Sequence, residues 1–162
     1  LSVKSSEGVY FVPAFAGLGA PYWDMNAKAA ISGISGGTNY KHIVRAAVEA
    51  MAFQTKDVLE AMKKDAKIEI NLLNVDGGAA SNNFLLQFQA DILNLDVLKP
   101  KIIESTALGI AFMVAIATKF KSIEEIKKSR IVEKHFQPKM VNHDRNKIYK
   151  SWLKSVERIR NT

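Results

Sequence analysis

The stretch Asn71-Leu-Leu-Asn-Val-Asp-Gly-Gly-Ala-Ala-Ser-Asn-Asn-Phe84 decides how this chain folds. An apolar run ends at Asp76-Gly77-Gly78 and helix-forming residues follow, so the stretch predicts a strand, a tight turn and a helix start. Adjacent glycines adopt conformations closed to other residues and let a ligand approach the main chain. The helix start adds unpaired N–H groups and partial positive charge. The stretch therefore predicts a nucleotide or phosphate site, with an ordinary turn as the alternative.

Composition limits the class of protein. A chain of 162 residues, 48% hydrophobic and 24% charged, is typical of one globular domain with its own core. It has no secretory signal and no run of the roughly 20 apolar residues that a membrane span needs. Cysteine is absent, which excludes disulfides and fits the cytoplasm. Because the chain begins at Leu1 without an initiator Met, we expect a piece of a longer protein.

The formal net charge of +7 is unevenly distributed. Residues 1–100 contain 9 Lys and Arg against 10 Asp and Glu, a net charge of −1, whereas residues 101–162 contain 14 against 6, a net charge of +8. The basic residues fall on predicted amphipathic helices and are not interleaved with base-stacking aromatics. A solvated helix face is therefore favoured over a nucleic-acid surface, and we predict neither nucleic-acid nor membrane partners.

Alternating strand and helix patterns predict an α/β fold. Strands are predicted over residues 9–12, 29–34, 69–75, 95–99 and 130–136. Helices are predicted from Thr38 or Asn39 to about Lys64, over 82–93, over 106–118, from the capping box Ser122-Ile-Glu-Glu125, and from an Asn142 cap to about Arg160. The first helix keeps a helical spacing at Ile43, Ala47, Ala50, Met51, Val58, Ala61 and Met62, with Gln54 as a polar exception.

Several kinds of catalytic motif are missing. The histidines at 42, 135 and 143 share no metal-ligand spacing, and we predict no metal site in this chain. There is no Walker-type phosphate loop and no Gly-x-Ser-x-Gly elbow. Asp76 is the nearest candidate for a general base, but a side-chain cap at the turn is the favoured role, because an aspartate is stabilised near a helix N-terminus.

Four motifs carry a resemblance to a known family. Val9-Tyr-Phe-Val-Pro-Ala-Phe-Ala-Gly-Leu-Gly-Ala-Pro-Tyr-Trp-Asp24 resembles a loop of glycerol kinases, which belong to the FGGY carbohydrate-kinase family. Ala29–Ile34, followed after seven residues by His42–Glu49, is similar to that family's second signature. Val75–Asn82 resembles the adenosine motif of the superfamily that includes actin, hexokinase and Hsp70-type chaperones. Thr106–Ala111 resembles its second connecting motif.

The resemblance implies a ribonuclease H-like, actin-like ATPase fold: a mixed sheet flanked by helices. Residues 1–162 would be the C-terminal part of a two-domain kinase that phosphorylates glycerol with ATP and Mg²⁺. Gly77, Gly78 and Asn82 match nucleotide-binding positions, and Ala107, Gly109 and Ala111 match the hinge. No catalytic residue matches in this chain, so the glycerol contacts and the catalytic aspartate would lie outside it. The chain alone would then be inactive, and the full-length form cytoplasmic and homo-oligomeric.

Other interpretations stay open at this stage. Another FGGY sugar kinase, or a non-catalytic nucleotide-binding or scaffold module, would show the same turn. The loop Pro13–Asp24 either forms a substrate wall with its aromatic residues or packs against its own domain, and packing is favoured. Small residues at 107, 109, 111 and 115 either admit a moving helix or reflect tight packing within one domain.

Overall fold

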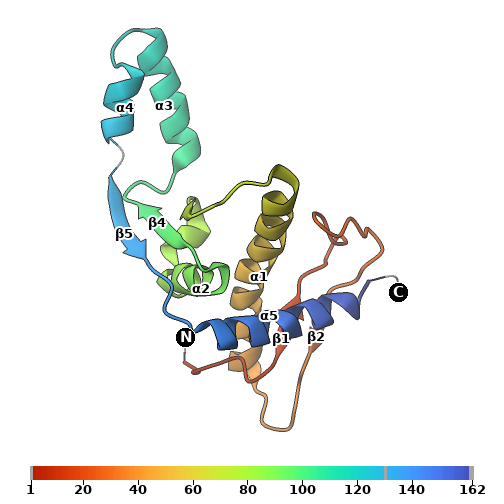
Figure 1. Cartoon of the computed structure of the whole chain (residues 1–162). Coiled ribbons are helices and arrows are strands. Elements are labelled where there is room, and N and C mark those ends of the chain that lie inside the picture. The colour runs from red at the N-terminus through yellow and green to blue at the C-terminus, as the bar shows by residue number, and fades with distance from the viewer. Residues whose placement is uncertain (1, 130, 161–162) are drawn as a thin grey trace.

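The computed structural model describes residues 2–129 and 131–160 (Figure 1). Its elements are, in order, β1 (Tyr10–Val12), β2 (Ala30–Ser32), α1 (Tyr40–Ala66), β3 (Leu72–Asn74), the 3₁₀ helix η1 (Gly78–Ser81), α2 (Asn83–Leu93), β4 (Asp96–Pro100), α3 (Ser105–Ala117), α4 (Ile123–Ser129), β5 (Val132–Phe136) and α5 (Asn142–Glu157). The predicted start of the last strand, Arg130, lies outside the described residues.

The strands form two small sheets. β1 and β2 pair antiparallel. β3 pairs parallel with β4, and β4 pairs antiparallel with β5, so the second sheet is mixed. A parallel pair needs a crossover connection, and α2 supplies it between β3 and β4. The predicted α/β fold with a mixed sheet flanked by helices is confirmed.

The body of the molecule consists of α1, α2, α5 and the β1–β2 sheet. Figure 1 shows α5 lying across α1 and the two strands. Phe53 of α1 stacks on Trp152 of α5, with ring centroids 5.1 Å apart, and meets Phe88 of α2 edge-on at 5.5 Å. Trp152 is 1% exposed. These aromatic contacts join three helices that are far apart in sequence into one core.

Helix α1 begins at the predicted position, because Asn39 caps it and His42 completes a capping box. The apolar spacing of this helix is only partly buried, however. Ala50 is buried, whereas Met51, Val58 and Met62 are exposed. The buried face carries other residues, several of them polar: His42, Ala46, Glu49, Ala50, Ala52, Phe53, Lys56, Asp57 and Leu59. Helix α1 therefore presents a second apolar face that the described residues do not cover.

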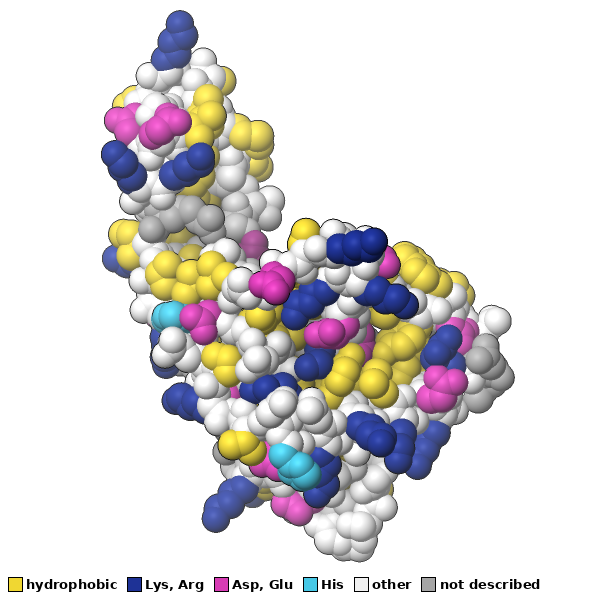
Figure 2. Space-filling view, viewed as in Figure 1, with side chains coloured by type: hydrophobic (Ala, Val, Ile, Leu, Met, Phe, Trp, Pro, Cys, Tyr) yellow, Lys and Arg dark blue, Asp and Glu magenta, His cyan; other side chains and the backbone are white. Residues whose placement is uncertain are grey.

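Helices α3 and α4 form an arm that extends away from the body (Figure 1). Their connection includes the predicted capping box, in which the Ser122 hydroxyl accepts from the Glu125 N–H at 3.2 Å and the Glu125 carboxylate accepts from the Ser122 N–H at 2.7 Å. Apolar side chains are visible on the arm surface in Figure 2. In the described ranges, no helix is both long enough and apolar enough to span a membrane.

Several element boundaries differ from the prediction, among them those of β3 and the cap of α5. Only Leu72–Asn74 of the predicted 69–75 strand is paired, because the neighbouring strand starts opposite Leu72, at Asp96. Asn142 does not cap α5, because Val141 holds the cap position without a side-chain bond. The Asn142 side chain instead accepts a hydrogen bond from Arg145 at 3.4 Å, inside the helix that it was predicted to cap.

Candidate nucleotide-binding site

The turn after β3 is fastened to the chain that leaves β4. The Val75 N–H donates to the Leu98 carbonyl at 3.2 Å, and the Gly77 N–H donates to the Ile103 carbonyl at 2.8 Å. Gly77 has a φ of +75°, a conformation that favours glycine. Of the two adjacent glycines, Gly77 has the positive φ and Gly78 does not.

Gly78 begins η1 and leaves main-chain donors open. Within residues 2–129 and 131–160, the N–H groups of Gly78 and Ala79 have no hydrogen-bond partner. A Cβ built on Gly78 would meet no atom within 4 Å. The turn therefore offers two free donors and open space beside them, which suits a phosphate or the flat face of a nucleoside.

Asn82 lies between η1 and α2 as the N-cap of α2. Its Oδ1 accepts from the N–H groups of Phe84 and Leu85 at 3.1 and 3.2 Å. The side chain is exposed, and its Nδ2 has no hydrogen-bond partner in the described chain. The sequence predicts a nucleotide contact for this amide, and the structure adds a helix cap. The geometry allows both, because the oxygen caps the helix while the NH₂ group stays free to donate.

The start of α2 is held against α1 by a cation–π contact. The Arg45 guanidinium lies 4.6 Å from the centroid of the Phe84 ring and donates through Nε to Glu49 at 2.7 Å. Glu49 is buried. These contacts fix the first turn of α2, and with it the position of the neighbouring Asn82.

Asp76 does not cap the turn as predicted. Its carboxylate accepts a hydrogen bond from the hydroxyl of Ser105, the first residue of α3. No local sequence pattern predicts this contact, since the two residues are 29 positions apart. The bond ties the nucleotide turn to the base of the arm.

A cavity of about 570 Å³ lies beside this junction, between the strand ends and the arm. Asp76, Ser105 and Gly109 all line it. Of the predicted hinge residues, Ala107 and Ala111 are exposed and do not line it. A Cβ on Gly109 would meet no atom within 4 Å, so the tight packing that the sequence offered as an alternative is not seen in this chain.

The three histidines have separate surroundings. His42 accepts from the Asn39 N–H in the capping box, His135 contacts Asp96 at 2.7 Å, and His143 is exposed. In the part of the chain that the structure describes, no three His, Cys, Asp or Glu side chains cluster closely enough to hold a metal ion.

The loop Pro13–Asp24 is anchored in the core, as the favoured packing alternative predicts, and the substrate-wall alternative stays a prediction. Ala14 and Leu18 are buried and belong to the core, as packing against the domain requires. Phe15 and Trp23 are 80% and 75% exposed. The loop is thus anchored by small and aliphatic residues while two large aromatic side chains project from it.

Comparison with known proteins decides the family. Residues 2–118 match the family model described as "FGGY family of carbohydrate kinases, C-terminal domain". The chain belongs to this family. A glycerol kinase from Thermoanaerobacter sp. (strain X514) is 53% identical over 98% of this chain, and one from Fusobacterium nucleatum subsp. nucleatum is 54% identical over 98%. The chain spans 32% of the length of each of these relatives.

Solved structures of FGGY kinases share the fold. The crystal structure of Plasmodium falciparum glycerol kinase with ADP superposes with a TM-score of 0.88 at 37% identity, over 97% of this chain and 32% of that one. A ligand-bound xylulose kinase from Lactobacillus acidophilus gives a TM-score of 0.76 at 25% identity, over 96% and 31%. The actin-like ATPase fold that the motifs imply is confirmed.

Proposed function

We propose that this chain forms the nucleotide-binding wall of an ATP-dependent glycerol kinase. The full-length enzyme would transfer the γ-phosphoryl group of ATP to the terminal hydroxyl of glycerol and release sn-glycerol 3-phosphate. The observation that carries the proposal is the pair of free amides at Gly78 and Ala79 beside the free Nδ2 of Asn82. The ADP named with the P. falciparum structure supports a nucleotide as the ligand.

Each residue of the turn has a distinct part in this proposal. The Gly77 N–H is used within the protein and holds the turn in place. Gly78 supplies a free N–H and the space in which no side chain interferes. Asn82 orients α2 through Oδ1 and donates to the ribose or a phosphate oxygen through Nδ2. The partial positive charge at the N-terminus of α2 favours the anionic end of the ligand.

The described residues do not form a magnesium site by themselves. Mg²⁺ is commonly held by one or two carboxylates together with the phosphates of the substrate. We therefore expect the ion to enter as ATP–Mg²⁺, with protein ligands outside this chain. The catalytic aspartate would also lie outside it. Phosphoryl transfer depends mainly on positioning and charge stabilisation, so the chain alone should not phosphorylate glycerol.

The uncovered apolar faces support the assignment of residues 1–162 to part of a larger kinase domain. Val44, Met51, Val58 and Met62 are exposed along α1, and no residue of α3 is buried. The matched glycerol kinases are about three times as long as this chain. The polypeptide that they carry beyond the matched region is the covering layer that we propose. Movement of that layer about Ala107, Gly109 and Ala111 would open and close the cleft.

Glycerol is the acceptor that identity favours. The matched glycerol kinases are 53 and 54% identical to this chain, whereas the L. acidophilus xylulose kinase is 25% identical. Activity of the full-length protein against glycerol and a panel of sugars separates these acceptors. Turnover of a sugar but not of glycerol would contradict the glycerol assignment and leave the kinase assignment standing. The cytoplasmic location and the homo-oligomeric state stay predictions.

The test of the turn uses variants of the full-length protein and titrations with ATP and glycerol. Gly78→Leu should block the nucleotide, because the added side chain fills space that is open in the folded chain. Asn82→Ala should weaken ATP binding roughly two- to tenfold, since a net polar contact contributes about 0.5–1.5 kcal/mol. The KM for glycerol should change little in both variants.

A matched pair of substitutions separates ligand contact from helix capping. Asn82→Asp keeps an oxygen for the cap but removes the NH₂ donor, so it should lower ATP affinity at an unchanged melting temperature. The neighbouring exposed Asn83 serves as the control, and Asn83→Ala should leave ATP affinity unchanged. If Gly78→Leu and Asn82→Asp both bind ATP normally, the turn is only a turn and the nucleotide assignment fails.

A further inference from the structure

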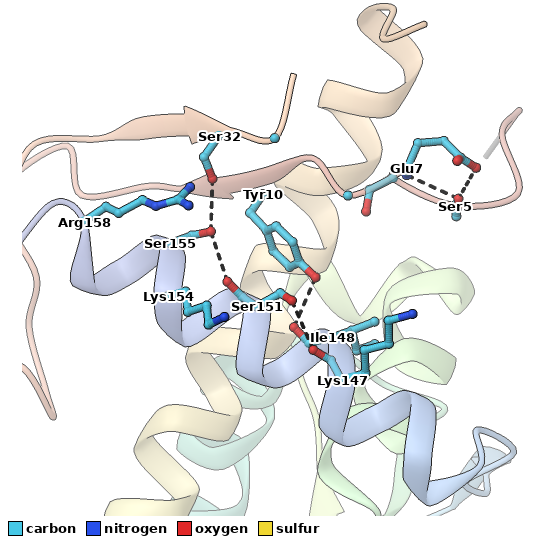
Figure 3. Close-up of a pocket in the computed structure, with 13 residues that line it drawn as sticks. Ser5, Glu7, Tyr10, Ser32, Lys147, Ile148, Ser151, Lys154, Ser155 and Arg158 are labelled. Atoms are coloured by element: carbon cyan, nitrogen blue, oxygen red, sulfur yellow. Dashed lines mark hydrogen bonds between the residues drawn. The ribbon is translucent and has the colours of Figure 1, made fainter. Parts of the chain in front are cut away.

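A second cavity, of about 580 Å³, lies on the opposite part of the fold from the arm, between α5, the β1–β2 sheet and the segment that precedes β1 (Figure 3). We call it the α5 cavity. Its lining residues are Ser5, Ser6, Glu7, Gly8, Tyr10, Ser32, Gly33, Lys147, Ile148, Ser151, Lys154, Ser155 and Arg158. None of them belongs to the nucleotide turn. The volume lies in the range of small-molecule sites.

Three cations line the cavity from one face of α5. Lys147, Lys154 and Arg158 are separated by seven and four residues, which places them on the same side of a helix. Among the residues that the structure describes, none of the three forms a salt bridge, whereas Arg160 on the same segment is paired with Glu157. Part of the excess positive charge of residues 101–162 therefore lies around the α5 cavity.

The only carboxylate in the lining is already engaged. Glu7 accepts a hydrogen bond from the Ser5 hydroxyl at the edge of the cavity. Three cations therefore face one acidic group, and the lining carries an excess of positive charge. A small anion would neutralise this excess.

Serine hydroxyls supply neutral polar groups between the cations. The Ser32 hydroxyl donates to the Ser155 hydroxyl at 3.0 Å, and Ser155 donates to the Ser151 carbonyl at 3.1 Å. Ser151 donates to the Lys147 carbonyl at 3.2 Å. A serine hydroxyl rotates to suit the partner that is present. Ser151 and Ser155 can therefore rotate to donate to a ligand oxygen.

The edge of the cavity is formed by backbone in close contact. A Cβ on Gly33 would lie 2.0 Å from the Gly8 carbonyl oxygen, and both glycines have a φ of +80°. The two segments can approach this closely only because Gly33 has no side chain. The Tyr10 hydroxyl, which donates to the Ile148 carbonyl at 3.2 Å, adds a tie between β1 and α5. The cavity is therefore shaped by the fold itself.

We propose that the α5 cavity binds a small anion that carries a phosphate group. A phosphate dianion matches the surplus of cations over carboxylates, and its several acceptor oxygens match the alternating ammonium, guanidinium and hydroxyl donors. The site is separate from the nucleotide turn and does not depend on the proposed kinase function. The anion's source, free phosphate or an organic phosphate ester, is left for the experiment to distinguish.

The experiment titrates residues 1–162 with inorganic phosphate and, separately, with glycerol 3-phosphate. Binding is followed by calorimetry and by the amide NMR signals of Ser32, Ser151 and Ser155. We expect both probes to shift these signals saturably. Binding of glycerol 3-phosphate at least tenfold tighter than inorganic phosphate would identify an ester as the source. Equal affinities would identify the phosphate group alone.

Charge-matched variants distinguish a site from a basic surface. Lys154→Gln with Arg158→Gln should weaken binding of inorganic phosphate by tenfold or more. Lys139→Gln with Lys150→Gln removes two cations that do not line the cavity and should leave binding unchanged. Asn82→Asp should also leave it unchanged, which keeps this result independent of the nucleotide assignment. Three results would overturn the proposal. The two double variants could weaken phosphate binding equally, they could weaken binding of duplex DNA equally, or phosphate could fail to shift the NMR signals saturably.

Discussion

The body and the arm differ in how they bury apolar side chains. In the body, Trp152, Leu86 and Ile92 are fully buried, and aromatic rings from three helices meet around Phe53. In the arm, no residue of α3 is buried, and Ile126 is the only buried residue of α4. Apolar side chains thus have opposite surroundings in the two regions. The body is stabilised by its own contacts, whereas the arm has the composition of a helix that another layer must cover.

The largest expected effect is on the aromatic core of the body. Phe53→Ala should lower the free energy of unfolding of residues 1–162 by about 3–5 kcal/mol, because it removes a buried ring and leaves a cavity between α1, α2 and α5. Met51→Ala on the exposed face of the same helix should change it by less than about 0.5 kcal/mol. Urea unfolding measures both values.

A milder substitution tests the same comparison if the Phe53→Ala variant does not fold. Phe53→Leu keeps an apolar side chain and should fold with a smaller loss of stability than Phe53→Ala. If Met51→Ala destabilises the chain as much as Phe53→Leu, the outer face of α1 is already covered in solution. The distinction between covered and uncovered surfaces would then be wrong.

The body also holds a buried polar group that the arm lacks. The Asp57 carboxylate accepts from the Tyr149 hydroxyl at 2.7 Å and from the Trp152 indole at 2.8 Å. Burial raises the pKa of Asp57 above its ordinary value of 3.8, and these hydrogen bonds lower it only in part. The folded state therefore holds this proton to a higher pH than the unfolded chain does.

This raised pKa predicts a specific pH dependence. The stabilising contribution of protonated Asp57 is fully present below pH 3.8 and is lost as the pH rises through the folded-state pKa. The Asp57→Asn variant has no carboxyl proton to lose at this position. The free energy of unfolding of the variant, relative to that of the unchanged chain, should therefore rise as the pH increases through the folded-state pKa of Asp57. The midpoints of urea unfolding, measured for both proteins from pH 3 upward in steps of roughly half a pH unit, give this stability difference. A stability difference between Asp57→Asn and the unchanged chain that stays constant over this pH interval would contradict the prediction.

Sequence reasoning succeeded where the signal is local. The Asn39 cap, the Ser122 and Glu125 capping box and the strand–turn–helix around Gly77 depend on residues within a few positions of one another. It failed where the partner is distant. Asp57 meets Tyr149 and Trp152 more than 90 positions away.

The apolar spacing of α1 does not identify the face that is buried, for a related reason. Periodicity finds apolar spacing, but it does not tell which of two apolar faces meets the core of this chain. The face with Met51 and Val58 follows the expected spacing and is exposed, while Lys56 and Asp57 are buried on the other side. The Lys56 ammonium donates a hydrogen bond to the Ile92 carbonyl at 2.7 Å, and this bond gives the buried charge a partner. No sequence pattern predicts this bond.

The smallest effect in this chain is expected at Gly109, and its sign should depend on the covering layer. In residues 1–162 alone, a Cβ at Gly109 meets nothing, so Gly109→Ala should not destabilise the chain. It should instead slow amide hydrogen exchange in α3, since alanine favours a helix over glycine by roughly 1 kcal/mol.

In the full-length protein, Gly109→Leu should overpack the proposed interface, cost roughly 1–3 kcal/mol of stability and lower kcat. Ala117→Leu, at the exposed end of α3, is the control in both settings. If Gly109→Leu leaves kcat and KM of the full-length enzyme normal, α3 is not the hinge helix. If it also leaves the melting temperature unchanged, the arm is uncovered in the whole protein as well.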